Sequence, residues 1–169
     1  MRTAERRPHA STREDNENLA SAARSAAIDL VAAVLRRSFG PDGFVRVHVP
    51  LDLGTRSKPK PDVSVVRGVP RDYSHRHPTT ALLVVDVSDT ASDRDRREQA
   101  SLYASVGVRE YWVLNLIDSV LKIRSEPCRD SATPFGHAYG RTTHLGRDDT
   151  IDTALLSAAS VRHVHELLP

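Results

Sequence analysis

The stretch Leu82-Leu83-Val84-Val85-Asp86-Val87-Ser88 is apolar on both of the faces that a strand presents. This pattern predicts a central strand over residues 81–87, in a sheet that is covered on both sides. The single carboxylate in the stretch is Asp86. A carboxylate in such surroundings is costly to bury unless it is neutralised, paired or bound to a metal. Asp86 is therefore the first candidate functional residue.

A second apolar stretch delivers another carboxylate. It reads Lys60-Pro61-Asp62-Val63-Ser64-Val65-Val66 and predicts a strand over residues 62–67. The loop 68–80 is long enough for this strand and 81–87 to run antiparallel as neighbours, which would bring Asp62 and Asp86 together. Two carboxylates and the backbone carbonyl of Val87 are oxygen ligands of the kind that divalent cations take. The sequence thus predicts a Mg²⁺ or Mn²⁺ site made by Asp62, Asp86 and Val87.

The remaining elements follow from hydrophobic spacing and from turn residues. The predicted helices cover residues 15–38, a segment that begins at Asp93 or Asp95 and ends at Gly107, and residues 161–168. Further strands are predicted over residues 44–53, 110–116, 120–124 and 141–145, and residues 125–139 are expected to be irregular. A crossover helix between 81–87 and 110–116 makes those two strands parallel. The order αβββαββ predicts an α/β fold with a mixed sheet.

Length and composition limit the alternatives. The 169 residues suit one domain over 15–169, preceded by a mobile tail over 1–14. The 24 basic and 22 acidic residues give a net charge of +2, so a nucleic-acid site would need a local basic patch. The single cysteine, Cys128 in an expected loop, excludes an internal disulfide and predicts a cytoplasmic protein. We expect no membrane span and no signal peptide.

A series of short motifs carries a family resemblance. The motifs are Pro61-Asp62-Val63, Arg76-His77-Pro78, Val84-Val85-Asp86-Val87-Ser88-Asp89-Thr90, Asp95, Tyr103, Gly107-Val108 and Glu110-Tyr111-Trp112-Val113. Over residues 15–168 the chain resembles the Uma-type family of the PD-(D/E)xK nuclease superfamily. The resemblance implies a restriction-endonuclease-like fold, a mixed central sheet flanked by helices. It also implies hydrolysis of DNA phosphodiester bonds with Mg²⁺ or Mn²⁺.

The resemblance makes Asp62 the first metal ligand and Asp86 the second, although the family usually has glutamate at the second position. The superfamily lysine two residues later is absent, since that position is Ser88. In this family a lysine commonly follows on the next helix, in an Asp-x-x-x-Lys pattern. Here Asp95 matches the aspartate and Gln99 replaces the lysine. We expect Gln99 to orient the attacking water or a phosphate.

Two functions remain open on these residues. One is a metal-dependent DNA endonuclease, in which Arg96 is the best substitute for the missing positive charge. The other is a catalytically degenerate nuclease fold that acts as a nucleic-acid-binding or protein-interaction module. A homodimer formed through 110–124 or 125–150 is compatible with either function.

Expectations for four other residues follow from their positions in the chain. Asp29 is the best candidate for an acid that the first helix brings to the metal, and a surface position is the alternative. His75 and His77 are expected to be solvated loop residues, although His77 could approach a phosphate. Tyr111 is expected to be a packing residue.

Overall fold

The computed structural model describes residues 11–54, 58–89, 94–156 and 162–169, without the side chains of 11–14, 94 and 95. The elements are α1 (Ser11–Phe39), η1 (Gly40–Asp42), β1 (Phe44–Val47), β2 (Val63–Val66), η2 (Pro70–Tyr73), β3 (Leu83–Ser88), α2 (Arg94–Ser105), β4 (Glu110–Asn115), β5 (Val120–Arg129), β6 (His137–Leu145), β7 (Thr150–Ile151), β8 (Arg162–His163) and η3 (Val164–Leu167).

The first six strands form one mixed sheet in the order β1-β2-β3-β4-β5-β6. β3 and β4 are parallel and are joined by α2, while every other neighbouring pair in this sheet is antiparallel. The predicted mixed sheet flanked by helices is confirmed. The predicted antiparallel neighbours, β2 and β3, and the predicted β4–β5 hairpin are present as well.

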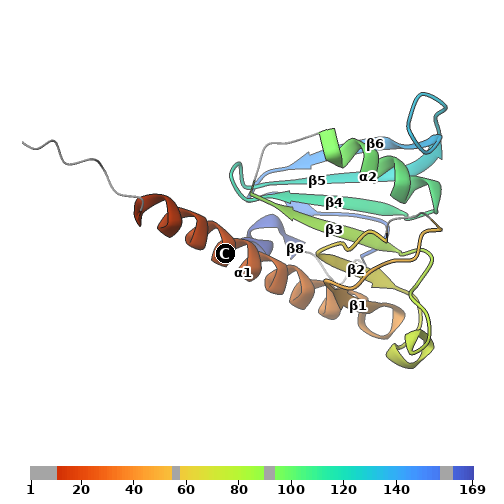
Figure 1. Ribbon diagram of the computed structural model, residues 1–169, viewed down its shortest axis with the longest axis horizontal. Coiled ribbons are helices and arrows are strands. Elements are labelled where there is room, and N and C mark those ends of the chain that lie inside the picture. Colours follow the sequence, from red (N-terminus) through yellow and green to blue (C-terminus); the bar gives the residue numbers. More distant parts are fainter. Residues whose placement is uncertain (1–10, 55–57, 90–93, 157–161) are drawn as a thin grey trace, which may run out of the picture.

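The two long helices cover opposite faces of the sheet. In Figure 1, α1 runs along the side formed by β1 to β3, and α2 lies over β5 and β6. Ala27, Val31 and Leu35 recur every four residues on α1 and are fully buried against one face. Tyr103 of α2 is buried against the other face, together with Val84 of β3. Because side chains alternate along a strand, Asp86 lies on the same face as Val84.

Some predicted boundaries are wrong near the N-terminus. α1 begins at Ser11, four residues before the predicted start at Asp15. Residues 1–10 of the expected tail lie outside the described part of the chain. The strand predicted over 44–53 ends at Val47 because His48 takes a left-handed backbone conformation with φ of 52°. The apolar Leu51 and Leu53 beyond it are buried in the core on the α2 side.

The C-terminal part departs further from the prediction. The expected irregular segment 125–139 is irregular only over 130–136, because β5 continues to Arg129 and β6 starts at His137. The added part of β5 is mostly exposed and the start of β6 is mostly half-buried, so neither shows the alternation that predicts a strand. Exposed Cys128 therefore lies in a strand and not in a loop. In place of a helix over 161–168, β8 pairs with β7 and the short η3 follows.

By length and composition, Asp15–Asp42 could cross a membrane, with a mean hydropathy of 1.3 over its most apolar window. A helix that packs in the core of a globular domain passes this test as well, so it does not by itself show a membrane span. The apolar residues in the C-terminal half of α1 pack in the core, where Ile28 and Val34 are buried together with Ala27, Val31 and Leu35.

Candidate functional site

The start of β2 and the end of β3 bring the two predicted acids together at one edge of the sheet. Asp62 directly precedes β2 and is 5% exposed, and Asp86 is half-buried within β3. The backbone N–H of Asp62 donates to Oδ1 of Asp86 at 3.4 Å. The backbone N–H of Val87 donates to Oδ2 of Asp62 at 2.8 Å. The three predicted metal ligands thus lie in mutual contact.

The guanidinium of Arg24 binds two of these three residues. Its Nη2 donates to both carboxylate oxygens of Asp62 at 2.8 Å, and its Nε donates to the carbonyl oxygen of Val87 at 3.1 Å. Residues 15–22 of α1 are exposed, so Arg24 belongs to the first part of the helix that meets the sheet. A positive charge therefore already sits against the oxygens that a metal would use.

A histidine flanks the same carboxylate. His48 lies beside Asp62, because its backbone N–H donates to the carbonyl oxygen of Asp62 at 2.9 Å. Its ring Nε2 is 3.4 Å from Oδ1 of Asp62. The left-handed backbone of His48 ends β1 and leaves the side chain half-exposed at the sheet edge. His48 is thus a second polar partner for Asp62.

Asp86 has a different set of partners. The hydroxyl of Tyr111 on β4 donates to Oδ2 of Asp86 at 2.9 Å and lies 3.3 Å from Oε1 of Gln99 on α2. Burial raises the pKa of Asp86, and the neighbouring Asp62 adds to the rise, while the hydrogen bond from Tyr111 acts in the opposite direction. Gln99, itself exposed, is therefore connected to Asp86 through one hydroxyl.

Positive charge lies beside this site on the α2 face. Arg96 of α2 donates through Nη2 to the hydroxyl of Ser88, the residue that stands where the superfamily has its lysine. Lys122 of β5 and His144 of β6 are cross-strand partners, and Val113 connects their row to Asp86. A cavity of about 490 Å³ lies along this row. It is lined by Arg96, Val113, Asn115, Asp118, Val120, Lys122 and His144.

The donor set suits a hard divalent cation. Asp62, Asp86 and the carbonyl of Val87 offer only oxygen, as Mg²⁺ and Mn²⁺ prefer. Among the described residues no group of three or more histidine, cysteine, aspartate or glutamate side chains is arranged to hold a metal. That the oxygens of Asp62 and Val87 already converge on a guanidinium shows that they can face one cation together.

Other predicted candidates lie elsewhere. Asp29 is exposed on α1 and His75 is exposed in its loop. His77 is half-buried, and its Nδ1 lies 3.4 Å from Nη2 of Arg46. The side chain of Asp95 lies outside the described part of the chain. The sequence interpretation missed Arg24 and His48 and treated Tyr111 only as a packing residue.

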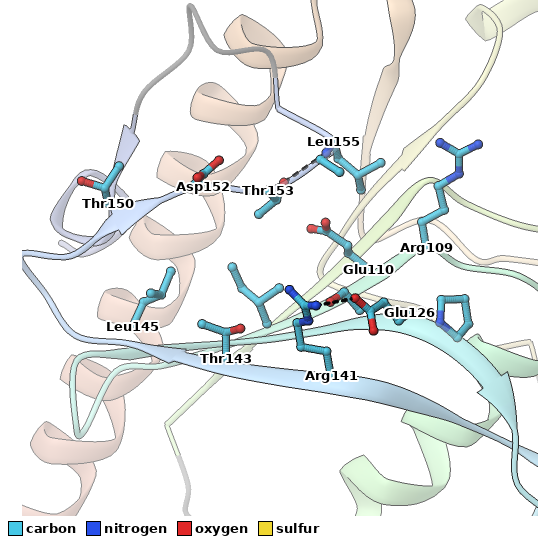
Figure 2. Close-up of a pocket in the computed structure, with 14 residues that line it drawn as sticks. Arg109, Glu110, Glu126, Arg141, Thr143, Leu145, Thr150, Asp152, Thr153 and Leu155 are labelled. Atoms are coloured by element: carbon cyan, nitrogen blue, oxygen red, sulfur yellow. Dashed lines mark hydrogen bonds and ion pairs between the residues drawn. The ribbon is translucent and has the colours of Figure 1, made fainter.

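A second cavity, of about 520 Å³, lies on the other face of the sheet (Figure 2). Its floor includes Glu110, which is 4% exposed and accepts a hydrogen bond from Nε1 of Trp112 at 2.8 Å. Burial raises the pKa of Glu110. The ion pair between Arg141 and Glu126 lies at the same cavity. Because Glu110 and Asp86 face opposite sides of the sheet, this cavity is separate from the Asp62 site.

Comparisons with known proteins agree with this architecture. The family model Uma2, described as "Putative restriction endonuclease", matches residues 14–152. Among solved structures, the chain resembles a "putative nuclease belonging to DUF820" from Anabaena variabilis, with a TM-score of 0.65 and 12% identity. The match covers 85% of this chain and 79% of that chain. No curated protein matches the sequence. The predicted restriction-endonuclease-like fold is confirmed.

Proposed function

This chain belongs to the Uma2 family of restriction-endonuclease-like proteins, and we propose that it is a nuclease that hydrolyses DNA phosphodiester bonds with Mg²⁺ or Mn²⁺. The observation that supports this proposal most is the contact between Asp62 and Asp86 at one sheet edge. Proteins with this fold typically use divalent metals, and the carboxylates are suitable ligands.

In the proposed reaction Asp62, Asp86 and the carbonyl of Val87 would hold the metal. A divalent cation supplies charge stabilisation for the phosphate and lowers the pKa of the attacking water. Tyr111 fixes the orientation of the Asp86 carboxylate through its hydroxyl. Gln99 places its Oε1 3.3 Å from the same hydroxyl, and its amide N–H groups would donate to a water or a phosphate oxygen.

The positive charge that a lysine commonly supplies comes from Arg96 in this proposal. Its contact with Ser88 keeps the guanidinium two residues beyond Asp86, at the place of the missing lysine. An arginine cannot act as a base near neutral pH, so its role is to stabilise the charge on the phosphate.

A plasmid-nicking assay with Mg²⁺ or Mn²⁺ tests the proposal. Asp62→Asn and Asp86→Asn keep the size of each side chain and remove the charge, so each variant should lose the metal-dependent nicking. Asp42→Asn, which changes an exposed aspartate far along the chain from both ligands, is the matched control. Unchanged nicking in both ligand variants would eliminate the metal site.

The second candidate function is a degenerate nuclease fold that binds nucleic acid or protein without cleavage. The ion pair between Arg24 and Asp62, together with Gln99 in place of a lysine, favours it. The double variant Asp86→Glu with Gln99→Lys restores the family residues. Nicking by the double variant and none by the natural chain would support degeneracy, whereas efficient turnover by the natural chain would exclude it.

A further inference from the structure

The guanidinium of Arg24 and the proposed metal ion would use the same oxygen atoms. We infer that Arg24 sets the affinity of this site for divalent cations, because a metal ion binds Asp62 and Val87 only when it displaces the Arg24 side chain. The inference rests on the proposed function, since it concerns the same metal site.

The hydrogen bonds of Asp62 leave little room for a further ligand. A carboxylate offers about four lone-pair directions. At Asp62, Oδ1 accepts from Arg24 and lies 3.4 Å from His48, and Oδ2 accepts from both Arg24 and the backbone of Val87. The carbonyl of Val87 accepts from Arg24 as well. A metal therefore gains these oxygens by replacing a partner.

Arg24 is the partner that can leave. The N–H of Val87 belongs to the backbone of a central strand and stays in place. The side chain of Arg24 is 41% exposed, so it can turn into water by rotation about its own bonds without a change in α1. Displacement of Arg24 thus opens the site while the sheet remains unchanged.

Charge reinforces the competition. With both carboxylates ionised, Asp62 and Asp86 carry two negative charges, which one divalent cation neutralises. If Arg24 stayed in place, the same partly buried group would hold a net positive charge, and the guanidinium would repel the metal at close range. Arg24 and a divalent ion therefore exclude each other.

Calorimetric titration of the metal-free natural chain with Mn²⁺, at fixed pH and in the absence of DNA, tests the inference. Arg24→Gln removes the charge and should bind Mn²⁺ with a Kd about tenfold lower than the natural chain. Arg24→Lys keeps the charge but lacks the planar fork that reaches Asp62 and Val87 through two separate nitrogens, so its Kd should lie between those two. Arg37→Gln alters net charge equally at an exposed position on the same helix and should leave the Kd unchanged.

Thermal unfolding gives a readout that does not depend on titration. Arg24→Gln leaves a buried carboxylate without its cation, so its Tm in EDTA should fall below that of the natural chain. Mn²⁺ should raise the Tm of Arg24→Gln by more than it raises the Tm of the natural chain. If Arg24→Gln does not fold in EDTA, the intermediate affinity expected of Arg24→Lys tests the same competition.

The outcomes separate this inference from the proposed function. Equal Mn²⁺ affinity in the natural chain and in both Arg24 variants would overturn the competition and leave the metal site intact. No Mn²⁺ binding by any of these folded proteins would overturn both the competition and the proposed metal dependence.

Discussion

The hydroxyl of Tyr111 donates to Oδ2 of Asp86 at 2.9 Å, diagonally across the parallel strands β4 and β3. This hydrogen bond favours the ionised form of a carboxyl whose pKa burial raises. A tyrosine that the sequence predicts as a packing residue therefore has a second role. It keeps Asp86 closer to the charged form that a metal requires.

Tyr111→Phe should move metal binding to higher pH. Removal of the hydroxyl raises the pKa of Asp86 further, so Asp86 takes up a proton at a higher pH as the solution is acidified. We expect the midpoint of Mn²⁺ binding against pH to rise by about one unit. Calorimetry across a pH series measures the midpoint.

Tyr139→Phe is the control for that series. It removes another largely buried hydroxyl, which donates to the carbonyl of Val108 at 2.9 Å and does not contact Asp86. Its midpoint should match that of the natural chain. An equal midpoint in Tyr111→Phe would contradict the role assigned to the hydrogen bond.

The acid pair was accessible to sequence analysis because both acids belong to strands with strong apolar patterns. Once the two strands are taken as antiparallel neighbours, the contact between Asp62 and Asp86 follows from their positions. The mixed sheet follows in the same way, from the crossover helix between β3 and β4. What these predictions share is a local pattern that fixes the long-range arrangement.

Arg24 and His48 lacked such a pattern. Arg24 lies between Ala23 and Ser25 on a helix, where an arginine ordinarily indicates a solvated position, and its partner is 38 residues away. His48 contacts Asp62 from a left-handed backbone position just beyond β1. Contacts of this kind depend on packing between elements, which spacing along the chain does not encode.

Glu110→Gln should remove a stability loss that develops as pH rises. The folded-state pKa of Glu110 lies above its ordinary value of 4.5, so the folded protein loses stability relative to the unfolded chain as pH rises from 4.5 through the folded pKa. Each unit of the pKa rise corresponds to about 1.4 kcal/mol. The substituted amide oxygen would still accept the hydrogen bond from Trp112, so the variant should be at least as stable as the natural chain near pH 8.

Urea denaturation from pH 4 to 8 measures this difference. The free energy of unfolding of Glu110→Gln, relative to that of the natural chain, should grow with pH and then level off. Glu126→Gln alters an exposed glutamate at the same cavity (Figure 2). The difference in free energy of unfolding between this variant and the natural chain should stay the same across the pH series. A constant difference between Glu110→Gln and the natural chain would show that Glu110 does not titrate in this range.

Lys122→Gln should weaken DNA binding by a similar factor for every sequence. Lys122 lies on the same face and in the same cross-strand row as Asp86, where a phosphate of bound DNA would pass. Loss of one phosphate contact lowers the slope of log K against log salt by about one. Fluorescence anisotropy in Ca²⁺ at several salt concentrations measures the slope. Arg109 lies beside the Glu110 cavity on the other face of the sheet, so Arg109→Gln should leave the salt slope unchanged.

The ion pair between Arg24 and Asp62 should show strong energetic coupling in the metal-free protein. Asp62 is nearly buried, so Arg24→Gln alone leaves its charge without a partner, whereas the double variant with Asp62→Asn removes both charges. Since the Arg24 side chain is partly exposed to solvent, we expect a coupling free energy of about 1–2 kcal/mol, below the range for fully buried pairs.

Urea denaturation in EDTA of the natural chain, both single variants and the double variant gives this value. The exposed pair of Lys58 and Asp52, 3.1 Å apart, is the matched cycle and should couple more weakly than Arg24 and Asp62 do. Equal coupling in the two cycles would mean that the Arg24 guanidinium does not stabilise the buried carboxylate.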